Sequence, residues 1–282
     1  MVYKKGSPRS AAFTLMELLV VMAIISMLMS ILMPSLNRAR ELSKSTVCLS
    51  NLRQFTLAWT IYASENNDKL CASDTEWNGR QPWNNELAHG NINSFWVSDG
   101  PGMPYNDYCG TELAIKNGIL WPYVEDLELY KCKSDRGGFV RGYAISHAMG
   151  NVHKFNKERN FLRSSKITMP TKRTVFMDVA ISPNRNSLGH MEGVGAAGSV
   201  YPIDTFDKHW IVGIKILTYR HSNGCNMSFA DGHCKSWKWK DKRTMELMDN
   251  AGDSEKRKEF SIGNPDIPPL MEVMRGARNR LF

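Results

Sequence analysis

The chain has 282 residues, of which 42% are apolar and 23% are charged. These proportions are typical of a globular protein, and they exclude a disordered chain, a collagen-like chain and a small disulfide scaffold. The formal net charge is +8, from 36 basic and 28 acidic residues. Lys4, Lys5 and Arg9 contribute three of these charges, so the remaining excess is mild and we expect no nucleic-acid partner.

An apolar segment follows this basic N-terminal stretch. Residues 13–33 contain one charged residue, Glu17, and Pro34 comes directly after them. As a helix, the segment would be about 31 Å long, close to the hydrocarbon thickness of a bilayer. Small residues at positions 10–12 precede the apolar run, whereas a secretory signal peptide has its cleavage site after the run. We therefore predict a membrane anchor that stays with the mature protein.

Glu17 is unusual in such a segment, because an unpaired carboxylate in hydrocarbon costs several kcal/mol. One explanation is that Glu17, near the start of the run, reaches the lipid headgroups. The other is that it pairs with a positive charge of a neighbouring subunit. The α-amino group of Phe13 would supply that charge if the chain were cut between Ala12 and Phe13.

The run from Phe13 to Ile25, which begins Phe-Thr-Leu-Met-Glu, resembles the N-terminal cleavage and methylation segment of type IV pilins and type II secretion pseudopilins. The resemblance implies that a prepilin peptidase cuts between Ala12 and Phe13 and methylates the new amino group. It also implies that Glu17 guides subunit assembly and that Pro34 kinks the helix. The family usually has Gly before the cut, and Ala12 stands there, so we expect slower processing.

The same resemblance implies where the chain is located and what it contacts. Basic residues flank the apolar segment on both sides, so their distribution selects no orientation. By the resemblance, the protein is a single-pass protein of the inner (cytoplasmic) membrane with a cytoplasmic N-terminus and an extracytoplasmic globular domain. Its expected partners are the lipid bilayer, the prepilin peptidase, other pilin or pseudopilin subunits and an inner-membrane assembly platform. We expect a structural subunit that is found in a filament or at the cell surface after assembly, and no enzyme.

The helical pattern continues past the apolar segment. Five apolar residues recur at spacings of three and four and so share one face of a helix: Cys48, Leu52, Phe55, Trp59 and Tyr62. We predict one helix from residue 13 to about residue 64, bent at its proline and ended by the polar residues 66–68. The face with the aromatic residues is expected to be core.

The rest of the chain predicts an α+β fold, in which the long helix packs on an antiparallel sheet as in pilins. Residues 67–118 are expected to be loops with short strands, and a short helical turn is expected at 120–124. Strands are predicted at 139–146, 173–179 and 211–219, and a hairpin at 226–230 and 233–239. The predicted segments are a leader (1–12), an assembly helix (13–34), an amphipathic helix (35–66) and a globular domain (67–282).

A second resemblance lies in the predicted hairpin. His221, nine residues and then Asp231-Gly232-His233 resemble a C-terminal motif of a group of large pseudopilin-like proteins, as do segments 48–54, 130–135 and 167–178. These residue types could bind zinc, but a two-residue type I′ turn at Asp231-Gly232 with a locally bonded His221 explains them without a metal. Asp204 and Asp207 are thin evidence for calcium. We predict no metal and no cofactor.

Six cysteines lie beyond the apolar segment, which allows 15 complete disulfide pairings. A two-residue turn would place Cys225 and Cys234 too far apart along their strands to be joined. We favour a disulfide between Cys48, on the buried helix face, and Cys132.

The sequence also allows an alternative function, that of a single-pass membrane-anchored binding module that never polymerises. Its ligand would be a carbohydrate stacked on Trp77, Trp83 and Trp96, although packing of these side chains is the more ordinary explanation. Such a module would not be cleaved at Ala12 and would not depend on Glu17.

Overall fold

The computed structural model describes residues 13–73, 97, 112–135, 140–146, 148–150, 161–179, 199–200, 218–249, 264–266, 269 and 272. The chain divides into two compact units, residues 1–42 and 43–282. Nothing in this division tests the predicted segment boundaries, which stay predictions.

The first element is the long helix α1, Leu15–Glu65, and it confirms the single helix predicted from the sequence. Pro34 lies inside α1, and the helix continues past it. The helix ends where the sequence predicted: Asn67 and Asp68 have left-handed backbone conformations, with φ of 55° and 67°. A bend at Pro34 remains a prediction.

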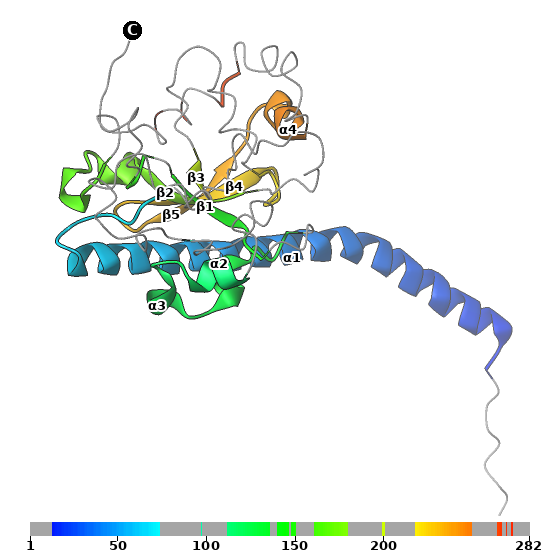
Figure 1. Cartoon of the computed structure of the whole chain (residues 1–282). Coiled ribbons are helices and arrows are strands. Elements are labelled where there is room, and N and C mark those ends of the chain that lie inside the picture. Colours follow the sequence, from blue (N-terminus) through cyan, green and yellow to red (C-terminus); the bar gives the residue numbers. More distant parts are fainter. Residues whose placement is uncertain are drawn as a thin grey trace, which may run out of the picture. The chain divides into compact units, whose positions relative to one another are not determined.

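The second unit contains a five-stranded sheet with the order β3-β1-β2-β4-β5 (Figure 1). The strands are β1 (Tyr143–Ser146), β2 (Thr174–Asp178), β3 (Ser199–Val200), β4 (Gly224–Phe229) and β5 (Cys234–Lys238). Four of them pair antiparallel, and the two-residue β3 is parallel to β1. This arrangement confirms the predicted α+β fold class with its long helix and antiparallel sheet.

The C-terminal half of α1 lies along the sheet (Figure 1). All five residues of the predicted apolar face are buried, as expected. Phe55 is at the centre, and its ring contacts Tyr130, Tyr143 and Phe176 at centroid distances of 4.7, 5.7 and 5.6 Å. Because large aromatic side chains contribute most of the buried apolar area, this cluster anchors the helix to the sheet.

Short helices complete the described part of the chain. They are α2 (Glu112–Lys116), α3 (Trp121–Val124), η1 (Leu127–Tyr130), η2 (Ser164–Lys166), η3 (Pro170–Lys172) and α4 (Lys242–Asp249). The turn predicted at 120–124 is confirmed by α3. The prediction of loops and short strands up to residue 118 is wrong at α2, where Ala114 and Ile115 are buried.

The strand predictions are confirmed at 143–146 and 174–178 and in the hairpin. Most of the predicted strand 211–219 lies outside the described residues, and its last two residues are not in a strand. Trp77, Trp83 and Trp96 also lie outside the described residues.

The hairpin turn differs from the predicted two-residue type I′ turn. That turn needs positive φ at both central residues, and here only Gly232 has it, at 90°. The amide of Gly232 donates to the Phe229 carbonyl and the amide of Phe229 donates to the His233 carbonyl, so the loop contains three residues. Ser228 therefore pairs with Cys234, and Cys225 with Trp237. A type I turn followed by a left-handed glycine explains Asp-Gly equally well.

Candidate functional site

The N-terminal segment begins with a capping box, which the sequence analysis missed. The Glu17 carboxylate accepts hydrogen bonds from the Thr14 amide at 2.9 Å and the Thr14 hydroxyl at 2.8 Å. In return, the Glu17 amide donates to the Thr14 hydroxyl oxygen at 3.3 Å. The signal was present in the sequence, because Thr-x-x-Glu before an apolar run is the usual pattern of this motif. Glu17 therefore has a partner within its own chain.

The apolar side chains that follow this cap are exposed. Exposed fractions reach 82% at Leu15 and 77% at Met16, and large apolar residues continue on all sides of the helix to Met33. Among the described residues, α1 is the one helix that is long and apolar enough to cross a membrane. A surface of this kind is not stable in water, so the segment needs lipid or other apolar helices around it. It indicates a membrane anchor.

The predicted processing and assembly residues lie at the start of this surface. Phe13 precedes the cap and is 72% exposed, while Ala12 lies outside the described residues. Pro34 follows the last apolar residue of the segment. Cleavage, methylation and the assembly role of Glu17 and Pro34 stay predictions.

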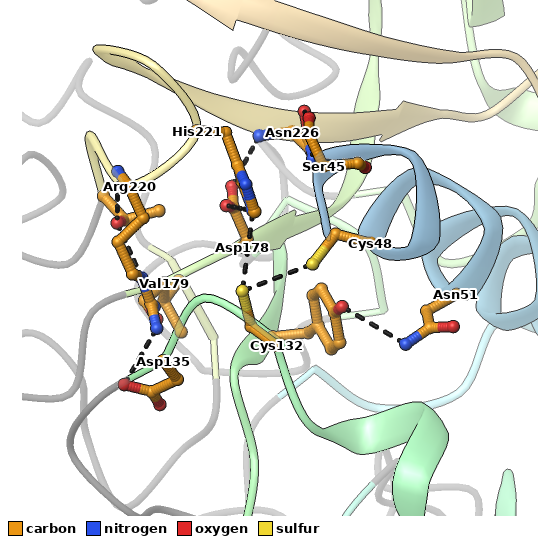
Figure 2. Close-up of polar contacts among 12 residues, drawn as sticks. Ser45, Cys48, Asn51, Cys132, Asp135, Asp178, Val179, Arg220, His221 and Asn226 are labelled. Carbon is orange, nitrogen blue, oxygen red and sulfur yellow. Dashed lines mark hydrogen bonds and ion pairs between the residues drawn. The ribbon is translucent and has the colours of Figure 1, made fainter. Parts of the chain in front are cut away.

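A second candidate site is buried between α1 and the sheet (Figure 2). It joins Cys48 of α1, Cys132, which follows η1, Asp178 at the end of β2, and His221 before β4. The two sulfur atoms are 3.3 Å apart, and Cys132 Sγ is 3.5 Å from His221 Nε2. His221 Nε2 is also 3.1 Å from Asp178 Oδ2. All four residues are at most 3% exposed.

Neighbouring polar groups orient this cluster. The Asn226 amide donates to Asp178 Oδ1 at 2.6 Å, and the Asn226 side-chain amide donates to the Ser45 carbonyl at 3.1 Å (Figure 2). Next to the cluster, Arg220 forms an ion pair with Asp135 at 2.9 Å. The carboxylate of Asp178 is thus held on one oxygen and turned toward His221 with the other.

The charges of these groups depend on one another. Burial raises the pKa of Asp178 above its ordinary value. Burial alone would lower the pKa of His221, but the hydrogen bonds and charges of Asp178 and Cys132 raise it to about 9. Both pKa shifts favour a proton held between Asp178 and His221. The contact with Cys132 lowers the pKa of the Cys48 thiol, whereas the contact with Cys48 and burial raise that of Cys132.

The structure separates the residues of the C-terminal motif. Asp231 and His233 lie at the hairpin turn, where Asp231 Oδ1 is 2.6 Å from His233 Nδ1 and the His233 ring stacks on Phe229. Gly232 supplies the turn, while His221 is in the buried cluster. The expectation that His221 bonds locally is wrong, because its ring contacts residues far away in the sequence.

The predicted Cys48–Cys132 disulfide stays a prediction. The structure brings the two sulfur atoms together but gives both cysteines as free thiols. Asp178 is the residue of the cluster that sequence reasoning missed. The available signal was a carboxylate that directly ends an apolar strand, Val175 to Met177. The calcium candidates Asp204 and Asp207 lie outside the described residues.

Comparison with known proteins identifies the N-terminal segment. Residues 7–33 match the family model of the prokaryotic N-terminal methylation motif. This match covers a short part of the chain, and it indicates an N-terminal segment of the prepilin type. Proteins with this motif are structural pilin-type subunits. No curated protein and no solved structure matches the chain.

Proposed function

We propose that this chain is a pilin-like structural subunit of a type II secretion or type IV pilus-type filament. In this proposal a prepilin peptidase removes residues 1–12, and the subunit then assembles through its N-terminal helix. The observation that carries the proposal is the methylation motif at residues 7–33, whose described part continues into an exposed apolar helix with Glu17 in its first turn.

The capping box explains how Glu17 is tolerated before assembly. In hydrocarbon each backbone donor needs a partner within the protein, and Glu17 provides one for the Thr14 amide. Cleavage before Phe13 creates an α-amino group directly next to Thr14. When subunits meet, the Glu17 carboxylate of one can pair with the Phe13 amino group of another. Because an unpaired charge is costly in a bundle of apolar helices, this pair sets the register between subunits.

The remaining partners and the location follow from the same role. The apolar half of α1 keeps the subunit in the inner membrane, with the N-terminus in the cytoplasm and the globular unit outside it. An inner-membrane assembly platform moves the subunit into the filament, where the helices of other subunits replace the lipid. The function of the chain in this proposal is assembly, not catalysis.

Processing is tested by intact mass and N-terminal sequencing of the detergent-extracted full chain. The protein is produced with an active prepilin peptidase, with an inactive one and with none. We expect a methylated Phe13 terminus only with the active peptidase, and faster conversion in Ala12→Gly. An intact Met1 terminus in the presence of the active peptidase would contradict the proposal and favour a static membrane anchor.

A further inference from the structure

Three buried side chains, Cys48, Cys132 and His221, bring possible ligand atoms within 4.8 Å of one another between α1 and the sheet, and Asp178 contacts His221 beside them (Figure 2). We propose that Cys48, Cys132, His221 and Asp178 bind one zinc-class divalent cation, which fixes α1 to the globular unit. This site was not predicted from the sequence, which favoured a disulfide and no metal. The proposal does not depend on processing or filament assembly.

The distances fit a metal better than they fit a disulfide. In a tetrahedral zinc site two sulfur ligands are about 3.8 Å apart, and a sulfur and a nitrogen ligand are about 3.6 Å apart. The observed distances are 3.3 Å between the sulfur atoms and 3.5 Å from Cys132 Sγ to His221 Nε2. All three atoms lie within 4.8 Å of one another. Small side-chain movements would complete the site, whereas a disulfide needs the sulfur atoms at about 2.05 Å.

The identity of the four groups also favours a metal. A disulfide would join the two cysteines but would not involve His221 and Asp178, which would only pair with each other at 3.1 Å. A cation uses all four, because thiolate, imidazole and carboxylate are the ligand types of zinc sites. Magnesium and calcium prefer sites made of oxygen ligands, so two sulfur atoms disfavour them. On binding, each thiol releases its proton to solvent, and the His221–Asp178 pair releases the proton that it holds, because the neutral imidazole must offer its Nε2 lone pair to the metal.

Asp178 lies beside His221, and in the proposal its carboxylate turns toward the ion as the fourth ligand. Its Oδ2 lies 3.1 Å from His221 Nε2, close to the spacing of about 3.4 Å between a nitrogen and an oxygen ligand of tetrahedral zinc. Its Oδ1 accepts the Asn226 amide at 2.6 Å, and Ser45 of α1 holds the Asn226 side chain. Such supporting hydrogen bonds are typical of metal ligands. Because four buried protein ligands would leave no open position on the ion, the proposed site is structural.

The test uses the full-length chain, extracted in detergent without a chelator. We expect about one zinc per chain by plasma mass spectrometry, since a closed site takes a single ion. Replacing zinc by Co²⁺ should give the near-ultraviolet sulfur-to-cobalt absorption and the intense visible bands of a tetrahedral thiolate site. Both measurements use the unmodified chain, so they decide the question even where a substituted chain fails to fold.

Variants then locate the ion. Cys48→Ser, Cys132→Ser and His221→Ala should lose the stoichiometric zinc, and Asp178→Asn should weaken zinc binding at least about tenfold. Cys234→Ser is the matched control, because Cys234 lies on β5 outside the cluster, and it should keep both zinc and the cobalt spectrum. Absence of zinc from the native chain, or peptide mapping that finds Cys48 joined to Cys132 by a disulfide, would overturn the proposal. Retention of zinc by the Cys48 and Cys132 variants would overturn it as well.

Discussion

The two ends of α1 belong to the same helix but have opposite surroundings. From Leu15 to Met33 the large apolar side chains are exposed, and they surround the helix on all sides. From Ser45 to Ala63 ten residues are buried against the rest of the second unit. The first stretch therefore needs lipid or other helices to cover its apolar side chains, whereas the second stretch packs against its own chain. Substitutions in the packed half should therefore change the free energy of unfolding, whereas substitutions in the exposed half should change filament assembly.

The largest effect is expected in the packed half. Phe55 is fully buried against three aromatic rings, so Phe55→Ala should lower the free energy of unfolding by about 3–5 kcal/mol. Urea denaturation of the detergent-solubilised protein, followed by tryptophan fluorescence, measures the change. The control is Leu57→Ala, two residues away and 59% exposed, which should change the free energy by less than about 0.5 kcal/mol. Equal losses in both variants would show that the packed face is misassigned.

The second effect belongs to the exposed half and should appear in assembly. Glu17→Ala removes both the cap and the charge, whereas Glu17→Gln keeps a capping residue and removes only the charge. If Glu17 pairs with a neighbouring amino group, both variants should lower the yield of sedimentable filaments at least about tenfold, which corresponds to about 1.4 kcal/mol per contact. The urea midpoint of the globular unit should not change.

Thr14→Ala is the matched control for this experiment. It removes the hydroxyl that accepts from the Glu17 amide at 3.3 Å and donates to the Glu17 carboxylate at 2.8 Å, but it leaves the carboxylate in place. If charge pairing drives assembly, this variant should assemble much better than Glu17→Gln. Normal filaments from Glu17→Gln, together with poor filaments from Thr14→Ala, would show that Glu17 acts only as a helix cap.

A smaller effect is expected where the packed half of α1 makes a polar contact with the sheet. The hydroxyl oxygens of Thr56 and Ser228 are 2.7 Å apart, and both residues are buried. Thr56→Val keeps the side-chain shape and removes this hydrogen bond, so it should cost about 1 kcal/mol of unfolding free energy. Thr60→Val is the control, because the Thr60 hydroxyl bonds to the carbonyl four residues earlier in the helix, as the Thr56 hydroxyl also does. No difference between the two variants would mean that the contact with Ser228 adds no stability.

The elements that local patterns define were predictable from the sequence. The long helix has a continuous apolar run and then a regular apolar face, and the hairpin has Asp231-Gly232 between two short strands. The exact turn was not predictable, because Asp-Gly fits both a two-residue and a three-residue loop. The helix α2 was missed because five residues are too few to show a period.

Of the buried cluster, the sequence suggested only the proximity of Cys48 and Cys132, as a disulfide, because no local spacing connects His221 and Asp178 to them. The sequence pattern connected His221 only to Asp231 and His233, which are close to it in the sequence. The pairing of β2 with β4 is what brings Asp178 beside His221, and the packing of α1 then adds Cys48. Long-range pairing of this kind leaves no periodic signal in a single sequence. The capping box, by contrast, was visible in the sequence as Thr-x-x-Glu.

The smallest effect is expected at the C-terminal end of α1. The Tyr123 hydroxyl donates to the carboxylate of Glu65, the last residue of α1, at 2.6 Å. This hydrogen bond, with burial and the charge of Glu65, raises the pKa of Tyr123 from 10 to about 12. The folded pKa is higher than the unfolded one, so the contribution to stability is complete below pH 10 and is lost as the pH rises to about 12.

Because the site is partly open to solvent, Tyr123→Phe should cost less than about 1 kcal/mol at pH 8. Urea denaturation of both proteins between pH 8 and 12 should show their difference shrinking toward zero above pH 10. Phe keeps the ring that packs against Tyr62, 6.3 Å away between centroids, so the comparison isolates the hydroxyl group, and a difference that stays constant over this range would show that the titrating hydrogen bond to Glu65 does not stabilise the end of the helix.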